Sequence, residues 1–161
     1  MLEHIRVIDL CDGASQFAGH ILARLGAEVI AVEPRGGVST RHSGPYVADD
    51  PHLDFSLTHW AYNRGKKSVV LDIELEHDRE KFLSLIQSAD ILFEDCQPGY
   101  LDSLGLSPLD LANTNPQIIH ASITSYGLTG PRSHWLGTDL TAVAGSSFLY
   151  ASGDADRAPL R

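Results

Sequence analysis

Short apolar runs alternate along the chain with segments of helical length. The amphipathic segments predict helices that begin near residues 12–15, at Glu76, at Ser107 and near Asp139. The apolar runs predict five strands, over residues 5–10, 28–32, 68–72, 90–93 and 117–123. Strands that are apolar on both faces and separated by helices indicate a mostly parallel sheet covered on two sides. The pattern therefore predicts an α/β fold with a Rossmann-like open sheet and helices on both faces.

The first two runs and the segment between them fit a βαβ unit. The intervening helix is expected to end at Gly26 and to carry one apolar face, formed by Phe17, Ile21, Leu22 and Leu25. Residues 36–65 show no clear periodicity, and they predict a long functional loop that leads into a short helix, because structureless loops of that length are otherwise uncommon.

Ligands of open α/β folds usually bind where loops leave the carboxyl ends of the strands. Four predicted loops leave the sheet at that edge, namely residues 11–16, 33–36, 94–99 and 125–130. We therefore expect a binding site to be built from these segments.

The chain has 161 residues, 43% of them hydrophobic and 20% charged, which is ordinary globular composition. Its net charge of −9 argues against nonspecific binding to nucleic acid. The first residues lack the pattern of a secretory signal, no stretch is apolar enough for a bilayer, and two cysteines make no disulfide framework. These features predict a cytoplasmic protein that does not associate with a membrane.

The positive charges are unevenly distributed, and an anionic small molecule could use them. Five of the 12 basic residues fall between positions 35 and 67: Arg35, Arg41, Arg64, Lys66 and Lys67. A solvated surface loop is the simpler interpretation of the same charges, and composition alone favours it.

Several familiar site patterns are missing from the sequence. Residues 11–16 hold one glycine, which does not make a dinucleotide-binding turn, and there is no Gly-Lys-Ser/Thr phosphate loop. No histidine has metal-ligand spacing with another His or Cys, so no metal site is expected. Cys96 follows Asp95 and has no neighbouring cation that would stabilise a thiolate, so it is not expected to be a nucleophile.

An ordered series of motifs nevertheless resembles one family. The segments that carry the resemblance are Leu25–Pro34, Asn63–Asp72 with its Asn-Arg-Gly-Lys-Lys-Ser start, Glu94–Gly99, Ser122–Pro131 and Gly137-Thr138-Asp139. Together they are similar, in order and spacing, to the class III CoA-transferases, which include formyl-CoA transferase, carnitine CoA-transferase and α-methylacyl-CoA racemase. The resemblance covers essentially all 161 residues.

The resemblance implies a larger enzyme that moves CoA between an acyl-CoA and a carboxylic acid, with no permanently bound cofactor. Residues 1–161 would be the N-terminal part of its large domain, and two copies of the whole protein would interlock as a homodimer. The nucleophile would be an aspartate shortly beyond Pro159-Leu160-Arg161. The positions that would bind CoA are Ser15, Gln16, Arg35, Arg41, Arg64, Lys66, Lys67, Leu71, Asp95 and Cys96.

Some positions depart from the family pattern. Asp95 and Cys96 replace Asn and Phe, Ser103 replaces a common Arg, and Glu74 stands where Lys is common. Each added negative or lost positive charge opposes a polyanion by about 1 kcal/mol when exposed. A CoA-binding or structural domain without catalysis is therefore an open alternative.

A racemase-like isomerase is the other alternative, and it depends on Asp139. In racemase relatives the matching aspartate works with a histidine as an acid/base pair. Thr138 precedes Asp139 here, and residues 107–116 contain no histidine. A helix-capping or pocket role for Asp139 is the simpler interpretation.

Overall fold

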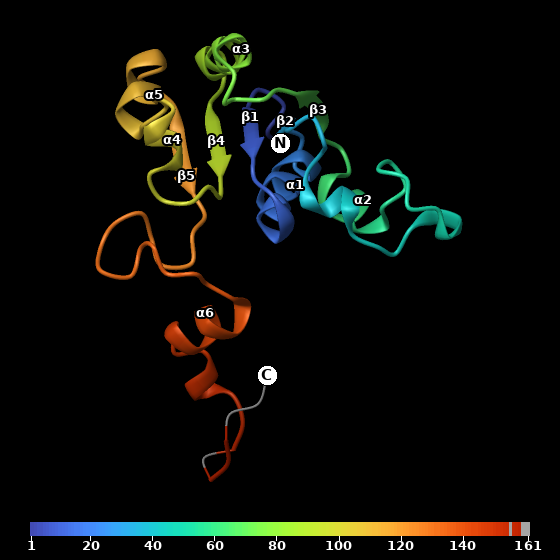
Figure 1. The fold of residues 1–161 in the computed structure, drawn as a ribbon, viewed down its shortest axis with the longest axis vertical. Helices are drawn as coiled ribbons and strands as arrows, with labels where there is room; N and C mark the ends of the chain where they lie inside the picture. Colours follow the sequence, from blue (N-terminus) through green and yellow to red (C-terminus); the bar gives the residue numbers. More distant parts are fainter. Residues whose placement is uncertain (155, 159–161) are drawn as a thin grey trace. The chain divides into compact units, whose positions relative to one another are not determined.

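The computed structural model of the chain describes residues 1–154 and 156–158, and its contacts form two compact units, residues 1–123 and the residues from 124 onward. The first unit holds one five-stranded sheet in the order β3-β2-β1-β4-β5 (Figure 1). Its strands are β1 Arg6–Leu10, β2 Glu28–Glu33, β3 Lys67–Val70, β4 Ile91–Glu94 and β5 Ile119–Ser122. All four strand pairings are parallel, which confirms the predicted open α/β sheet.

The helices of the described residues are α1 Gln16–Arg24, α2 Leu57–Asn63, α3 Glu76–Gln87, α4 Tyr100–Ser103, α5 Pro108–Thr114 and, in the second unit, α6 Asp139–Gly145. Five of the helices lie where the sequence predicts them, and the short α4 is not predicted. Short 3-10 turns lie at Gly13–Ser15, Ser39–His42, Val47–Asp49 and Leu149–Ala151. No helix of the described residues combines the length and the apolar character needed to cross a membrane.

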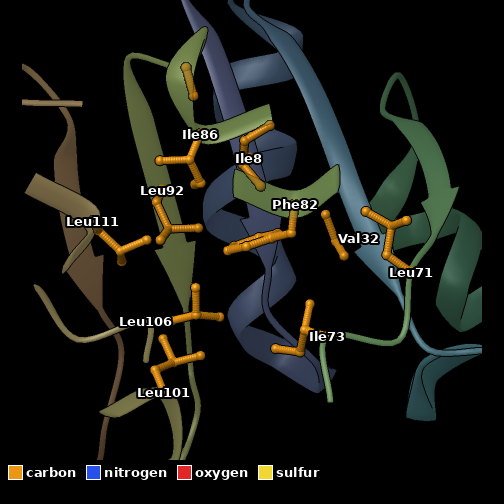
Figure 2. Packing of buried hydrophobic residues seen from close by; sticks show 11 residues of the cluster. Ile8, Val32, Leu71, Ile73, Phe82, Ile86, Leu92, Leu101, Leu106 and Leu111 are labelled. Atoms are coloured by element: carbon orange, nitrogen blue, oxygen red, sulfur yellow. The ribbon is translucent and has the colours of Figure 1, made fainter. Parts of the chain in front are cut away.

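Adjacent residues of β1 face opposite sides of the sheet, and a separate core covers each side. Ile8 belongs to the larger cluster, where Phe82 and Ile86 of α3 pack between Leu92 and Val32 (Figure 2). Phe82 and Ile86 are fully buried, and burial of each stabilises the fold by about 1.5–3 kcal/mol. Helices therefore cover both faces, as predicted.

The opposite face carries the smaller core, which packs against α1. Val7 and Val29 are buried there, with Leu22 and Ala23 of α1 against them. The expected apolar face of this helix is only partly correct, because Phe17, Ile21 and Leu25 remain 50%, 45% and 39% exposed. Gly19 of α1 lies against Asp9 of β1, where a side chain would have no room.

Residues 36–65 form the expected long loop and short helix. The loop contains two 3-10 turns and a cis peptide bond between Gly44 and Pro45 before it enters α2. Ser56 caps α2 by accepting a 3.1 Å hydrogen bond from the backbone N–H of His59. The Ser56 hydroxyl also lies 2.6 Å from the carbonyl oxygens of Thr40 and Ser43, which ties the loop to the helix start.

The second unit is organised around α6. Thr138 is its N-cap, and a reciprocal hydrogen-bonding arrangement with Thr141 forms a capping box. Asp139 is the first residue of the helix, where a negative charge is favourable. The predicted start of this helix is confirmed.

Candidate functional site

A hollow of about 440 Å³ opens at the carboxyl ends of the strands, and we call it the strand-tip hollow. Its lining is Leu10, Cys11, Asp12, Val32, Pro34, Val38, Leu71, Asp72, Ile73, Glu74, Asp95, Cys96 and Tyr100. β1 is the central strand of the sheet: β2 and β3 lie on one side of it, and β4 and β5 lie on the other. The hollow therefore lies at the topological switch point, where ligands of open α/β sheets bind.

Three of the four predicted binding loops contribute to this hollow. Cys11 and Asp12 follow β1, Pro34 follows β2, and Asp95 and Cys96 follow β4. The fourth loop, residues 125–130, belongs to the second unit. Among the predicted CoA-binding positions, Leu71, Asp95 and Cys96 line the hollow directly.

The charged residues of the strand-tip hollow are all acidic: Asp12, Asp72, Glu74 and Asp95. Both carboxylate oxygens of Asp95 lie 3.0 Å from the backbone nitrogen of Asp12. Burial raises the pKa of Asp95, and the charges of Asp12 and Asp9 add to this rise, while hydrogen bonds from Asp12 and Ser15 oppose it. The predicted ligand residue Ser15 thus already contacts Asp95.

Both cysteines of the hollow, Cys96 and Cys11, remain thiols at neutral pH. Burial, together with the charges of Glu94 and Asp95, raises the pKa of Cys96 to about 12. The nearby Cys11 is buried, and burial with the charge of Asp9 raises its pKa further still.

Beside the hollow, a buried ion pair joins β1 to the segment before β3. Lys66 Nζ donates a 2.7 Å hydrogen bond to Asp9 Oδ2, and both side chains are 1% exposed. The ammonium also donates to the Gln16 carbonyl at 2.7 Å and to Asn63 Oδ1 at 2.9 Å. All three protons of the Lys66 ammonium are therefore used within the protein, so the structure places this predicted CoA-binding residue inside the fold.

The buried side chain of Gln16 also connects separate segments of the chain through hydrogen bonds. Its side-chain nitrogen donates to the Cys11 carbonyl at 3.2 Å, and its oxygen accepts from Thr40 Oγ1 and Asn63 Nδ2, both at 2.9 Å. The residue is 2% exposed, so its amide connects the loop after β1 with the 36–65 segment. The sequence suggests a ligand contact here, whereas the structure places the side chain inside the protein.

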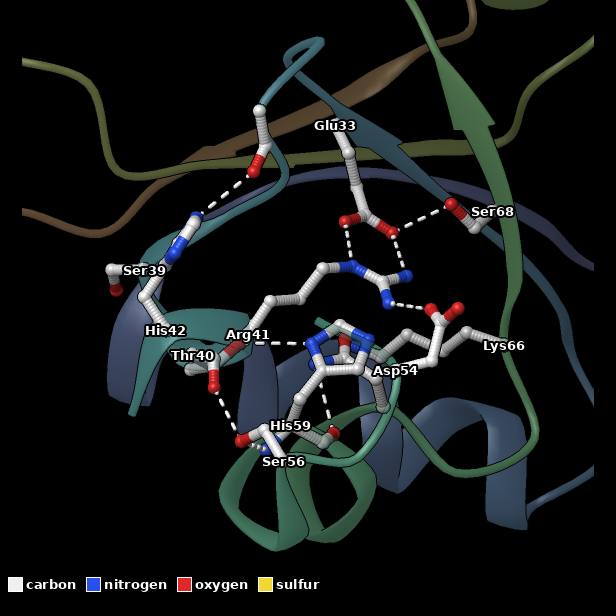
Figure 3. A network of polar contacts seen from close by, with 12 residues as sticks. Glu33, Ser39, Thr40, Arg41, His42, Asp54, Ser56, His59, Lys66 and Ser68 are labelled. Atoms are coloured by element: carbon white, nitrogen blue, oxygen red, sulfur yellow. Dashed lines mark hydrogen bonds and ion pairs between the residues drawn. The ribbon is translucent and has the colours of Figure 1, made fainter. Parts of the chain in front are cut away.

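His59 completes this polar network from α2 (Figure 3). Its Nδ1 lies 3.0 Å from Thr40 Oγ1 and 3.2 Å from Asn63 Nδ2. Burial lowers the pKa of His59, and the charge of Arg41 lowers it further. The neutral imidazole is the favoured form; because Thr40 Oγ1 donates its proton to Gln16, Nδ1 can donate to Thr40 in one tautomer or accept from Asn63 in the other.

Arg41 is held between two carboxylates, as Figure 3 shows. Its guanidinium donates to the two oxygens of Glu33 at 2.5 and 2.8 Å, and Nη1 donates to Asp54 Oδ1 at 2.9 Å. Burial alone raises the pKa of Glu33, but hydrogen bonds from Arg41 and Ser68 outweigh it and hold that pKa below its usual value. The fork geometry fixes the loop after β2 against the sheet.

The predicted cluster of five cations does not gather at one place. Lys67, at the start of β3, pairs with Glu28 at the start of β2, so it lies at the amino edge of the sheet. Arg35 and Arg64 are exposed, and neither lines the strand-tip hollow. The order of cations along the chain could not reveal this, because Arg41, Lys66 and Lys67 each pair with a different carboxylate.

A second and larger hollow, of about 760 Å³, lies beside α1 and α2, and we call it the α1–α2 hollow. Its lining is His20, Arg24, Arg41, Asp54, Leu57, His59, Trp60, Ala61, Asn63 and Arg64. Arg24 is not among the predicted site residues, because nothing in the sequence distinguishes it from the other basic residues at the surface.

Buried acids at the strand ends are the residues that sequence reasoning missed. Asp9, Glu33 and Glu94 are each about 1–2% exposed. Glu94 lies 3.4 Å from His120 Nε2; burial raises its pKa, but hydrogen bonds from His120 and Ser122 hold it below the usual value. The available signal was a single acidic residue near the end of an otherwise apolar strand.

The catalytic predictions concern the second unit and the end of the chain. Asp139 is exposed at the first position of α6, and Thr138, not Asp139, provides the cap. Its proton-transfer role stays a prediction. Pro159-Leu160-Arg161, after which the nucleophile is expected, lie outside the described residues. Within residues 1–154 and 156–158, no three His, Cys, Asp or Glu side chains are grouped to hold a metal ion.

Comparison with curated proteins finds relatives across the whole chain. It is 42% identical over 161 residues to the acetyl-CoA:oxalate CoA-transferase of Acetobacter aceti, and 40% identical over 160 residues to the BbsE subunit of the succinyl-CoA:(R)-benzylsuccinate CoA-transferase of Thauera aromatica. These matches cover 99% of the chain but only 40% and 39% of the two relatives. The chain thus spans about two fifths of the length of the curated relatives it matches.

Solved structures agree with this assignment. A CAIB/BAIF family protein from Brucella suis matches with a TM-score of 0.86 at 34% identity, over 99% of this chain and 42% of that protein. Rv3272 from Mycobacterium tuberculosis matches with a TM-score of 0.81 at 35% identity, over 99% of this chain and 44% of that protein. A sequence model described as CoA-transferase family III matches residues 2–161. The chain therefore belongs to CoA-transferase family III.

Proposed function

We propose that residues 1–161 are the N-terminal part of an enzyme that transfers CoA from an acyl-CoA donor to a carboxylic acid acceptor. The observation that carries this proposal is the match to CoA-transferase family III over residues 2–161, with relatives that are named as CoA-transferases. The strand-tip hollow supports it, because the hollow lies at the switch point of the sheet.

In this proposal the strand-tip hollow receives part of the CoA carrier. Leu71 and Val32 give it an apolar wall, and Cys96 and Tyr100 line it from the segment after β4. Burial of apolar surface would therefore provide most of the affinity there. The four carboxylates of this lining repel phosphate groups, so the CoA phosphates would lie outside the hollow.

The proposed chemistry uses a carboxylate nucleophile that lies beyond the described residues. Its oxygen attacks the thioester carbonyl carbon, the C–S bond breaks, and CoA leaves as the thiolate while an acyl anhydride forms. The thiolate then attacks the enzyme's own carbonyl and releases the acid, and the acceptor carboxylate repeats the two steps in reverse. We propose that the described part binds and positions the carrier, and that the whole protein is a cytoplasmic homodimer.

The test is an exchange assay on the longest polypeptide that the gene encodes. It is supplied with an unlabelled acyl-CoA and a labelled carboxylic acid, and formation of the labelled thioester is measured. Labelled thioester is expected in the presence of both substrates only. A polypeptide that binds CoA in calorimetric titration but never forms the labelled thioester would refute the transferase proposal and support a binding domain instead.

The same assay separates an isomerase from a transferase. A racemase-like enzyme would exchange the α-proton of a branched acyl-CoA in deuterated water without any acceptor acid. We expect no such exchange, because residues 107–116 offer no histidine as the partner of Asp139. Exchange without an acceptor would overturn the transferase assignment.

A further inference from the structure

Two neighbouring strands, β1 and β4, carry a buried carboxylate at or near the residue where they end. Asp9 Oδ1 accepts a 3.1 Å hydrogen bond from the backbone N–H of Cys11, two residues further along the chain. Glu94 Oε2 accepts a 2.7 Å hydrogen bond from the backbone N–H of Cys96 in the same way. Each acid therefore holds the backbone of the segment that leaves its strand and enters the lining of the strand-tip hollow.

The pairing of β4 with β5 holds the other oxygen of Glu94. Glu94 lies opposite Ser122, and His120 lies opposite Leu92, so the three polar side chains share one face of the sheet. Glu94 Oε1 is 3.4 Å from His120 Nε2, and the Ser122 hydroxyl oxygen is 3.4 Å from the same nitrogen. The side chain of Glu94 is only 3% exposed, so these contacts are internal to the first unit.

The segment 95–100, which follows Glu94, forms one side of the strand-tip hollow. Asp95, Cys96 and Tyr100 line the hollow from this segment. The Asp95 carboxylate accepts from the backbone N–H of Asp12, and the Tyr100 hydroxyl donates to Glu74 Oε1 at 3.1 Å. The places of these lining side chains therefore depend on the backbone conformation at Cys96.

Packing alone does not call for an acid at the end of β4. Leu92 occupies the preceding position on the same face and belongs to the larger core, where an apolar side chain is sufficient. A buried carboxylate costs desolvation free energy that an apolar side chain would not. What Glu94 provides, and an apolar residue could not, is an acceptor for the Cys96 N–H.

We propose that Glu94 is a positioning residue for the thioester carrier, because it fixes the segment 95–100 through the Cys96 N–H. His120 orients the Glu94 carboxylate from β5. Glu94 does not line the strand-tip hollow itself, so it acts through the backbone of this segment. The inference rests on the proposed function, since it takes the strand-tip hollow as the site that receives the carrier.

The first experiment measures binding of coenzyme A by calorimetric titration to the longest polypeptide that the gene encodes. Glu94→Met keeps the length of the side chain but removes the acceptor, and it should weaken binding about tenfold. Glu94→Gln keeps an acceptor oxygen for the Cys96 N–H, so its affinity should stay within about twofold of the parent. Equal weakening in the two variants, or no binding by the parent, would overturn the proposal.

Asn115→Ala is the matched control for a loss of stability. Asn115 Nδ2 donates to the carbonyl oxygens of Ile86 at 2.9 Å and Ala89 at 2.7 Å, so it anchors the chain before β4, at the opposite end of that strand from Glu94. The variant should unfold more easily, as denaturant unfolding measures, and bind coenzyme A as the parent does. An equal loss of affinity in Asn115→Ala, or an unchanged affinity in Glu94→Met, would show that Glu94 only stabilises the fold.

Hydrogen exchange of the Cys96 amide tests the contact without any ligand. Mass spectrometry of overlapping peptides should show this amide exchanging at least about tenfold more slowly than in an unstructured peptide. Glu94→Met should remove the protection, and Glu94→Gln should retain it. An unprotected Cys96 amide in the parent would overturn the proposal even if Glu94→Met does not fold.

The CoA exchange assay separates this inference from the proposed function. Glu94→Met should raise the KM for the acyl-CoA about tenfold and leave the KM for the acceptor acid unchanged. Exchange with an unchanged acyl-CoA KM would overturn the role of Glu94 and leave the transferase proposal intact. Weaker binding of coenzyme A by Glu94→Met, together with no exchange by the parent, would refute the transferase proposal and support the positioning role.

Discussion

At the scale of single residues, the ionised groups beside the sheet are stable only as pairs. Asp9 and Lys66 are both 1% exposed, and each alone would be a buried charge without compensation. The Gln16 carbonyl and Asn63 Oδ1 take the remaining protons of the ammonium. Such a site tolerates removal of one partner poorly, since the other keeps its full desolvation cost.

Lys66→Met is therefore expected to lower the free energy of unfolding by about 3–5 kcal/mol, because it leaves the Asp9 carboxylate buried and unpaired. Denaturant unfolding monitored by circular dichroism measures the change. Lys67→Met is the matched control: the Lys67 side chain is 71% exposed, and its pair with Glu28 is a surface pair worth about 0–1 kcal/mol. Equal losses in the two variants would contradict the argument.

The lowered pKa of His59 makes the stability of the fold depend on pH. Burial and the charge of Arg41 lower its pKa in the folded chain, so the unfolded chain binds its proton more readily. The contribution of His59 is complete above the ordinary histidine pKa and is lost as the pH falls through the lower folded value. The free energy of unfolding should therefore fall as the pH is lowered from about 7.5 to about 5.

His59→Asn tests that assignment, because an asparagine amide can still hydrogen-bond with Thr40 and Asn63 but does not titrate. The variant should lose stability less steeply over the same pH range than the parent chain, in parallel denaturant titrations. An identical slope in both proteins would show that another group causes the pH dependence.

At the scale of elements, α1 approaches the sheet through a glycine. A Cβ atom at Gly19 would lie 2.1 Å from Asp9 Oδ2 and 3.3 Å from the Lys66 Cε atom, and the first of these distances is too short for any real contact. The helix can thus sit over the buried ion pair only where one residue has no side chain. This explains why Leu22 and Ala23 pack on the sheet while Phe17 and Ile21 stay half exposed.

Gly19→Ala is expected to destabilise the chain by about 1–3 kcal/mol, since the overpacking outweighs the better helix propensity of alanine. Thermal and denaturant unfolding measure the change. Gly145→Ala in α6 is the matched control, because a Cβ there meets no atom within 4 Å. It should be neutral or slightly stabilising, and a comparable loss at Gly145 would argue against the packing explanation.

At the scale of the whole molecule, charge is distributed unevenly between the two hollows. The strand-tip hollow collects Asp12, Asp72, Glu74 and Asp95, and these carboxylates oppose a ligand that carries phosphates. At two of these positions, Glu74 and Asp95, the resemblance described above implies Lys and Asn instead. Their replacement should therefore change CoA affinity in a predictable direction.

Glu74→Gln and Asp95→Asn should each tighten CoA binding about fivefold, which corresponds to removal of about 1 kcal/mol of repulsion. Calorimetric titration with coenzyme A measures the effect, and the amide oxygen introduced by Asp95→Asn can still accept the backbone N–H of Asp12. Glu80→Gln on α3 removes an exposed carboxylate that does not line the hollow, and it should leave affinity unchanged. Equal gains in all three variants would indicate a nonspecific effect of net charge.

Sequence patterns were enough to predict the five strands, most of the helices and the parallel sheet, because apolar runs of strand length and helices of fixed period are local properties. The βαβ spacing made the strands parallel, and the carboxyl ends of β1, β2 and β4 gathered the predicted loops, as the lining by Asp12, Pro34 and Asp95 shows. Motif order also sufficed to indicate the family.

The role of each charged residue depends on how the chain folds. Lys66 and Lys67 are neighbours in sequence, yet one is buried against Asp9 and the other is exposed beside Glu28. Likewise, Arg24 and Arg64 lie 40 positions apart and line one hollow. Charge pairing depends on distance through space and on burial, and both are set by how α1 and α2 pack together, which no local pattern encodes.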